Sequence, residues 1–474
     1  MKKYFLVILF LYATLTVAAQ TVNFRNISLD EACNIAKKEN KIVMLVLESA
    51  TCNQCNEVAM QGLSGSIIKR FTDNSCVIIK MSEQPLGLIS SNNLFQLGAV
   101  VFGVVYLDGD KNILNIQANS SSSYSSYLDQ IEKALNEKDN TENNIVTLKR
   151  NYYNNVNGFT SVIKLVEKIR LLKLEPSELL VDDMMDKAPK DSLESLSFLQ
   201  FVNECAPLVN SLAQKKLYRN SDNGNMAWYR LSREARVAIN NRITQKSLDR
   251  AIKEKDASYA YAVANTVRGH YQSGSPETMQ KMYQSTLLRY YKGVKDSATY
   301  IRMALPYYNQ YFMSINVDSI TRLDSIQRLK MSTSIPPIKS EELDRLLRDA
   351  KQSGKPITST VKQFVTTSTN VSPQGQYYCN NLNEAAWTLY TFTKDIVVLN
   401  KALIFSKKSN EFLISPEAMD TYARLLYKTG NKSEAINWET KAIAAMKMRG
   451  FGSNRDFEKV LIKMQADDTV IDQY

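Results

Sequence analysis

The most constraining feature of the sequence is a short apolar run that ends just before a pair of cysteines. Residues 42–47, IVMLVL, are all apolar, as is typical of a strand covered on both faces of a sheet. Cys52 and Cys55 follow in the segment SATCNQC, where the next helix is expected to begin. A helix N-terminus favours thiolate, and a spacing of three residues in one turn brings two sulfur atoms within bonding distance. The sequence therefore predicts a dithiol at the end of a buried strand.

Helices and strands alternate on both sides of this pair. The expected order over residues 24–137 is helix, strand, helix, strand, a poorly defined stretch, strand, strand, helix, which predicts an α/β domain. Strands are expected at 42–47, 76–81, 102–107 and 113–117, the last two as a hairpin around the turn sequence DGDKN. The first helix should bury one face, made of Leu29, Ala32, Cys33 and Ala36, and one helix after the cysteines should carry Val58, Leu63, Ile67, Ile68 and Phe71.

The remainder of the chain has helical periodicity. The polar residues 138–144 are predicted to be a linker, residues 145–375 a helical region, and residues 451–474 a capping helix with a tail. Between them, residues 376–450 contain an imperfect repeat of two helices. Aromatic residues recur in this repeat, which predicts that three of them are buried between helices: Trp387, Tyr422 and Trp438.

The N-terminus has the pattern of a secretory signal. Lys2 and Lys3 precede an apolar stretch that is shorter than a membrane span, and Val17-Ala18-Ala19 fits a cleavage site. We expect residues 1–19 to be removed and the protein to be periplasmic or secreted; the alternative is an uncleaved anchor. We expect no stable membrane span after cleavage.

The composition excludes several classes of function. The net charge of +11 falls to +9 without Lys2 and Lys3, and the basic residues are scattered among acidic ones, so we expect no nucleic-acid partner. The sequence has one histidine and no second close cysteine pair, and it has no glycine-rich phosphate loop, so we expect neither a metal nor a cofactor. Four cysteines stand alone and are expected to be buried apolar residues: Cys33, Cys76, Cys205 and Cys379.

The strand followed by Cys-x-x-Cys and a helix resembles the thioredoxin fold over residues 24–137. This resemblance implies that Cys52 is the exposed, attacking thiol and that Cys55 is the resolving thiol. It also matches Lys80, in CVIIKM, to a lysine that thioredoxins keep near their active site.

The sequence departs from thioredoxins at three other positions around the site. Thr51 stands where they have a tryptophan, and Val46 stands where they have a buried acid that assists proton transfer. Phe102 stands where they have a cis-proline at the start of the third core strand, and a cis bond before a residue other than proline costs about 3 kcal/mol. We therefore expect a trans bond at Phe102 and a different loop beside the cysteines.

The repeat at 376–450 is similar to tetratricopeptide repeats, and the whole chain resembles secreted thioredoxin-family proteins of some Gram-negative bacteria. The resemblance implies thiol-disulfide exchange on client proteins, or with a partner redox protein, through Cys52 and Cys55. One alternative is a redox-inactive envelope adaptor with a structural disulfide, in which the fold and the repeats bind proteins. A peptide- or glycan-handling role in the envelope is the other.

Overall fold

The computed structural model describes residues 21–49, 53–81, 95–97, 103–219, 221–272, 274–334, 373–448, 455–468 and 471. The predicted signal peptide, Thr51, Cys52 and Phe102 lie outside these residues. The chain divides into two compact units, residues 1–246 and 247–474. Each unit is described by itself.

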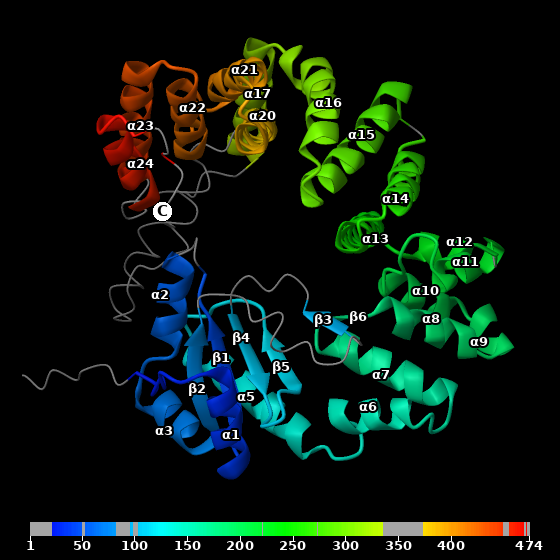
Figure 1. Cartoon of the computed structure of the whole chain (residues 1–474). Helices are drawn as coiled ribbons and strands as arrows, with labels where there is room; N and C mark the ends of the chain where they lie inside the picture. Colours follow the sequence, from blue (N-terminus) through cyan, green and yellow to red (C-terminus); the bar gives the residue numbers. More distant parts are fainter. Residues whose placement is uncertain are drawn as a thin grey trace, which may run out of the picture. The chain divides into compact units, whose positions relative to one another are not determined.

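The first unit contains a mixed sheet of four strands, ordered β2-β1-β4-β5 (Figure 1). β1 pairs in parallel with β2 and antiparallel with β4, and β4 pairs antiparallel with β5. All six residues of β1 are buried, as the unbroken apolar run predicted. The four strands are β1 (Ile42–Leu47), β2 (Cys76–Met81), β4 (Gly103–Leu107) and β5 (Ile113–Gln117).

Helices cover both faces of this sheet. α1 (Leu29–Lys38) begins with a capping box between Ser28 and Glu31, and its predicted apolar face is buried. The odd-numbered residues of β1 belong to the same apolar cluster as α1, whereas Met44 and Val46 belong to a second cluster with α3 and α5. The helices after β1 and β5 are α2 (Asn53–Gly62), α3 (Ser66–Ser75) and α5 (Tyr124–Asp139).

The helix after the cysteines is broken in two, which corrects the expectation of one continuous helix. α2 ends at Gly62 and α3 begins at Ser66. Gly65 has a φ of 120°, a conformation that residues with a Cβ rarely adopt, so the helix cannot continue through it. Gly62 packs so closely that an added Cβ would lie 2.2 Å from the carbonyl oxygen of Ser121. The break therefore follows from the conformation of Gly65, which hydrophobic periodicity does not reveal.

The first unit continues into helices beyond the sheet. Residues 140–144 form the turn between α5 and α6, so the segment predicted as a linker is shorter than expected. A two-stranded sheet, which was not predicted, pairs β3 with β6 in antiparallel fashion. These elements are β3 (Phe95–Leu97), α6 (Ile145–Tyr153), α7 (Phe159–Leu171), β6 (Leu174–Pro176), α8 (Glu178–Lys187), α9 (Lys190–Glu194), α10 (Leu196–Glu204), α11 (Leu212–Arg219) and α12 (Ser221–Arg230).

One apolar cluster joins the sheet to these helices. It contains Val105 and Ile116 of the sheet together with Ile145 of α6 and Leu165 of α7. Lys168 of α7 also pairs with Glu137 of α5 at 2.8 Å. The α/β part and the helices after it thus share a core.

The second unit is helical in all its described elements. The division between the units falls inside α13 (Arg233–Glu254). Neighbours along the chain pack as pairs, notably α14 with α15, α20 with α21, and α22 with α23. The elements are α14 (Ala257–His270), α15 (Pro276–Gly293), α16 (Ser297–Tyr308), the π-helix η1 (Asn309–Met313), α17 (Val317–Ser334), α20 (Pro373–Phe392), α21 (Ile396–Phe412), α22 (Pro416–Lys428), α23 (Lys432–Met448) and α24 (Arg455–Gln465).

The predicted repeat coincides with two helix pairs, α20–α21 and α22–α23 (Figure 1). Tyr422 is buried, as predicted, and Trp438 is partly buried with its ring 5.1 Å from that of Tyr422. The prediction that Trp387 is buried is wrong, because 37% of it is exposed. Trp387, in α20, stacks on Tyr390 of the same helix and contacts the Arg424 guanidinium of α22. Its ring therefore packs on other side chains but stays partly open to solvent.

Across the described parts of the chain, no helix is both long and apolar enough to cross a lipid bilayer.

Candidate functional site

The described part of the cysteine pair is Cys55, in the first turn of α2. Cys55 is partly buried and disulfide-bonded. The other four described cysteines, which the sequence analysis assigned to the core, are free and buried. Cys52, the one remaining cysteine of the sequence, lies outside the described residues, as does its neighbour Thr51.

The position of Cys55 follows from the strand before it. β1 lies between β2 and β4 in the sheet. The backbone N–H of Glu48 donates to the carbonyl oxygen of Met81 at 2.9 Å, which extends the pairing with β2 by one residue. The chain therefore leaves the sheet from an interior strand, and α2 starts within a few residues of that point.

Asn56 ties this exit to the first turn of α2. The Ser49 backbone N–H donates to Asn56 Oδ1 at 2.8 Å, and Asn56 Nδ2 donates to the Ser49 carbonyl oxygen at 2.9 Å. Both polar groups of the carboxamide are thus bonded to one backbone residue. These bonds tie Ser49, the last described residue after β1, to the first turn of α2, and no sequence motif had pointed to Asn56.

Val46 makes this end of β1 apolar. It is 3% exposed and belongs to the cluster that α3 and α5 cover. It pairs with Lys80 on one side and with Val104 on the other. Val46 therefore supplies no group that can transfer a proton.

Lys80 lies at the end of β2, with 52% of its side chain exposed. Its Nζ is 3.3 Å from Glu48 Oε1 and 6.0 Å from the centroid of the Phe24 ring. The structure thus pairs Lys80 with Glu48, two residues along the chain from Val46, and sequence analysis had missed this carboxylate. Phe102 lies outside the described residues, so its predicted role stays a prediction.

The free thiols are unsuited to exchange chemistry. Burial raises the pKa of Cys33 to about 11 and the pKa values of Cys76 and Cys205 to about 12. Cys379 lies within 3.3 Å of Ser409 Oγ and 3.2 Å of the Leu413 carbonyl oxygen in the core of the second unit. Thiolate is the reactive form of cysteine, so the raised pKa values disfavour exchange by Cys33, Cys76 and Cys205.

Among the described residues, no group of three or more His, Cys, Asp or Glu side chains is arranged to hold a metal ion.

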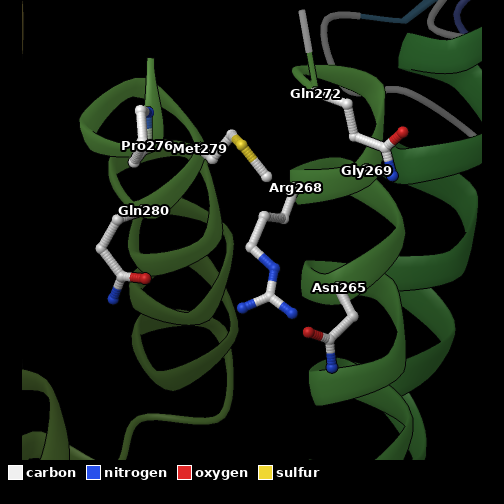
Figure 2. Close-up of a pocket in the computed structure, with 7 residues that line it drawn as sticks. All are labelled: Asn265, Arg268, Gly269, Gln272, Pro276, Met279 and Gln280. Atoms are coloured by element: carbon white, nitrogen blue, oxygen red, sulfur yellow. The ribbon is translucent and has the colours of Figure 1, made fainter. Parts of the chain in front are cut away.

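The second unit has a polar cavity of about 350 Å³ between α14 and α15. Figure 2 shows Arg268 extending from α14 into the space between the helices, with Met279 of α15 pointing toward it. The guanidinium lies over the Tyr283 ring, 5.3 Å from its centroid. Arg268 and three carboxamides make this cavity suited to hydrogen bonding with an acidic or peptide-like group; the carboxamides belong to Asn265, Gln272 and Gln280.

No protein-family model, curated protein or solved structure matches this chain.

Proposed function

We propose that the protein is a thioredoxin-like thiol-disulfide exchange protein of the periplasm or the extracellular space. The observation that carries the proposal is the state of Cys55. It is disulfide-bonded at the start of a helix that follows an interior strand, whereas the four other described cysteines are free and buried. A helix N-terminus stabilises the thiolate that exchange requires.

The proposed reaction uses the two cysteines in turn. In the reduced protein, the Cys52 thiolate attacks one sulfur of a client disulfide, forms a mixed disulfide and releases the other client sulfur as a thiolate. The Cys55 thiolate then attacks Cys52 Sγ, which releases the second client sulfur and closes the Cys52–Cys55 disulfide. Two electrons pass to the client, and the reverse sequence oxidises a client.

The arrangement of the sheet supports a thioredoxin-like assignment. β1 is interior, it is parallel to β2, and an antiparallel hairpin of β4 and β5 completes the sheet. The pairs α20–α21 and α22–α23 support tetratricopeptide-like repeats, which would bind the client or a partner redox protein. The cavity beside Arg268 is a second place where such a partner could bind.

The test is to trap the mixed disulfide. With Cys55→Ser, attack by Cys52 should stop at the covalent intermediate, so non-reducing gels of periplasmic extract should show adducts that disappear with reductant. Cys52→Ser should give none. Cys205→Ala is the matched control, because the Cys205 thiol is buried and has a raised pKa, and this variant should behave as the wild type does.

The second candidate function is a redox-inactive adaptor in which the disulfide is structural. The apolar environment of Val46 favours it, because the site lacks the acid that thioredoxins use there. This reading predicts that Cys55→Ser traps nothing and that Cys52 of the reduced wild type resists alkylation. That pair of results would exclude exchange and leave the fold and repeats as protein-binding modules.

A further inference from the structure

A second cavity of the helical unit is lined by a lysine that has no hydrogen-bonding partner among the described residues. This cavity, of about 220 Å³, lies between α15, η1 and α20. Seven of the side chains that line it carry polar groups: Glu277, Thr278 and Lys281 of α15, Gln310, Tyr311 and Ser314 of η1 and the turn after it, and Tyr378 of α20.

Lys281 is surrounded by aromatic rings. Its Nζ lies 4.6 Å from the centroid of Phe312 and 5.7 Å from those of Tyr311 and Tyr377. Within the part of the chain that the structure describes, this ammonium has no hydrogen bond and no ion pair. Its pKa is lowered by burial, while the Glu277 carboxylate acts in the opposite direction. Ring faces attract the charge but leave its three N–H donors without acceptors.

The π-helical turn η1 forms the side of the cavity next to Lys281. Pro306 interrupts the hydrogen bonding of α16, and η1 follows at Asn309–Met313. Tyr311 and Phe312, adjacent in sequence, are both buried, at 6% and 0% exposure. Gln310 and Ser314 are exposed and also line the cavity. Single π-helical turns often occur at functional sites, because they redirect neighbouring side chains.

The lining defines the chemistry of the ligand. The ammonium favours a negatively charged acceptor, and the side-chain amide of Gln310 can donate a further hydrogen bond to it. The Ser314 hydroxyl donates to the Gln310 backbone carbonyl oxygen at 2.7 Å, and the Thr278 hydroxyl lies 3.0 Å from that of Ser275. The volume is smaller than the roughly 300–1,000 Å³ of pockets that enclose drug-sized ligands, so it suits one small group. We propose that this cavity binds a carboxylate, carried either by a small organic acid or by an acidic side chain of a bound peptide, with Lys281 as its charge partner.

Removing the charge of Glu277 should change the affinity for a carboxylate in the opposite direction from removing the charge of Lys281. Glu277 lines the same cavity and is exposed. Its carboxylate repels a bound carboxylate, so removing that charge should tighten binding while removing the charge of Lys281 weakens it. The site lies in the second unit and does not depend on exchange by Cys52 and Cys55, so Cys55→Ser should leave it unchanged.

Titration calorimetry with the full mature chain tests the proposal, with two probes. One is sodium benzoate, and the other is the blocked peptide acetyl-Gly-Glu-Gly-amide, with its Gln analogue as the neutral control. Lys281→Met, which keeps the apolar stem, should weaken binding by about tenfold or more. Glu277→Gln should tighten it severalfold, and circular dichroism should show that both variants are folded.

Arg250→Met is the matched control, because the Arg250 guanidinium also lies over a tyrosine ring, 4.9 Å from the centroid of Tyr259, but Arg250 lines neither cavity. This variant should bind as the wild type does. Binding of benzoate alone would assign the site to a small acid, and binding of the Glu peptide but not its Gln analogue would assign it to a peptide side chain. The proposal is overturned if neither probe binds, if Lys281→Met binds normally, or if Arg250→Met loses as much affinity.

Discussion

At the scale of the residue, Glu439 makes the stability of the second unit depend on pH. This side chain of α23 is fully buried, and its pKa is raised to about 9, first by burial and then by the nearby Asp420 carboxylate. Asp420 is itself buried and paired with Arg424 at 2.8 Å, and Arg424 opposes the shift. Glu439 therefore holds its proton in the folded protein at neutral pH.

The sign of the pH dependence follows from this raised pKa. An unfolded glutamate loses its proton near pH 4.5, so between that pH and about 9 the folded state binds the extra proton. The free energy of unfolding should therefore fall as the pH rises, by at most about 1.4 kcal/mol per pH unit from this group. Glu439→Gln should flatten the dependence of unfolding free energy on pH and be more stable than the wild type at pH 8, as measured by urea unfolding at pH 5, 7, 8 and 9.

Glu434→Gln, at an exposed position of the same helix, is the control and should not alter the slope. An unchanged slope in Glu439→Gln would show that another group causes the dependence.

At the scale of the element, the end of α2 depends on the absence of a side chain at Gly62. A Cβ there would lie 2.2 Å from the Ser121 carbonyl oxygen and 2.5 Å from the Tyr127 ring. Tyr127 is fully buried in α5, so neither neighbour can move away easily. This contact holds α2, the helix of Cys55, against the helix that follows the sheet.

Gly62→Ala should therefore destabilise the first unit by about 1–3 kcal/mol, the usual cost of forcing extra atoms into a packed core. Chemical denaturation of the full chain, followed by a probe in the first unit, measures the change. Gly269→Ala in α14 is the matched control, since the nearest atom to its new methyl group would be 3.9 Å away, and it should cause no loss. Equal stability of Gly62→Ala and wild type would mean that the loop at Ser121 can move.

At the scale of the whole molecule, the sheet and the helices that follow it share one apolar core. α1 contacts β1 and β2, and the same apolar cluster continues through Ile113 and Ile116 to α6, α7 and α8. Lys149 of α6 also donates to Asn112 Oδ1 at 3.1 Å, in the turn between β4 and β5. A cut after residue 137 would expose the apolar surface that these helices cover.

We therefore expect a fragment of residues 21–137 to be less stable than a fragment of residues 21–254, which keeps α13 whole. The shorter fragment should unfold at a lower urea concentration and bind a hydrophobic dye, because buried apolar area is the main source of stability. Equal unfolding midpoints would instead support the independent domain at 24–137 that the sequence predicted.

Local patterns in the chain were sufficient to predict several elements and which of their faces are buried. The unbroken run at 42–47 predicted an interior strand, the spacing of Leu29 and Ala36 predicted a buried helix face, and the lone cysteines were predicted to be core residues; all three are confirmed. These features depend on the order of polar and apolar residues over one or two turns, which a single sequence displays. Cys55 at the start of α2 belongs to the same class.

Contacts between residues that are distant in the chain could be known only once the chain was seen folded. The pairing of Lys80 with Glu48, the pairing of β3 with β6, and the rings around Lys281 join residues from separate elements. The exposure of Trp387 likewise depends on how α20 packs, although its place in the repeat predicted burial. Periodicity specifies a face but not its partner, because the free energy that selects the partner comes from packing between elements far apart in the chain.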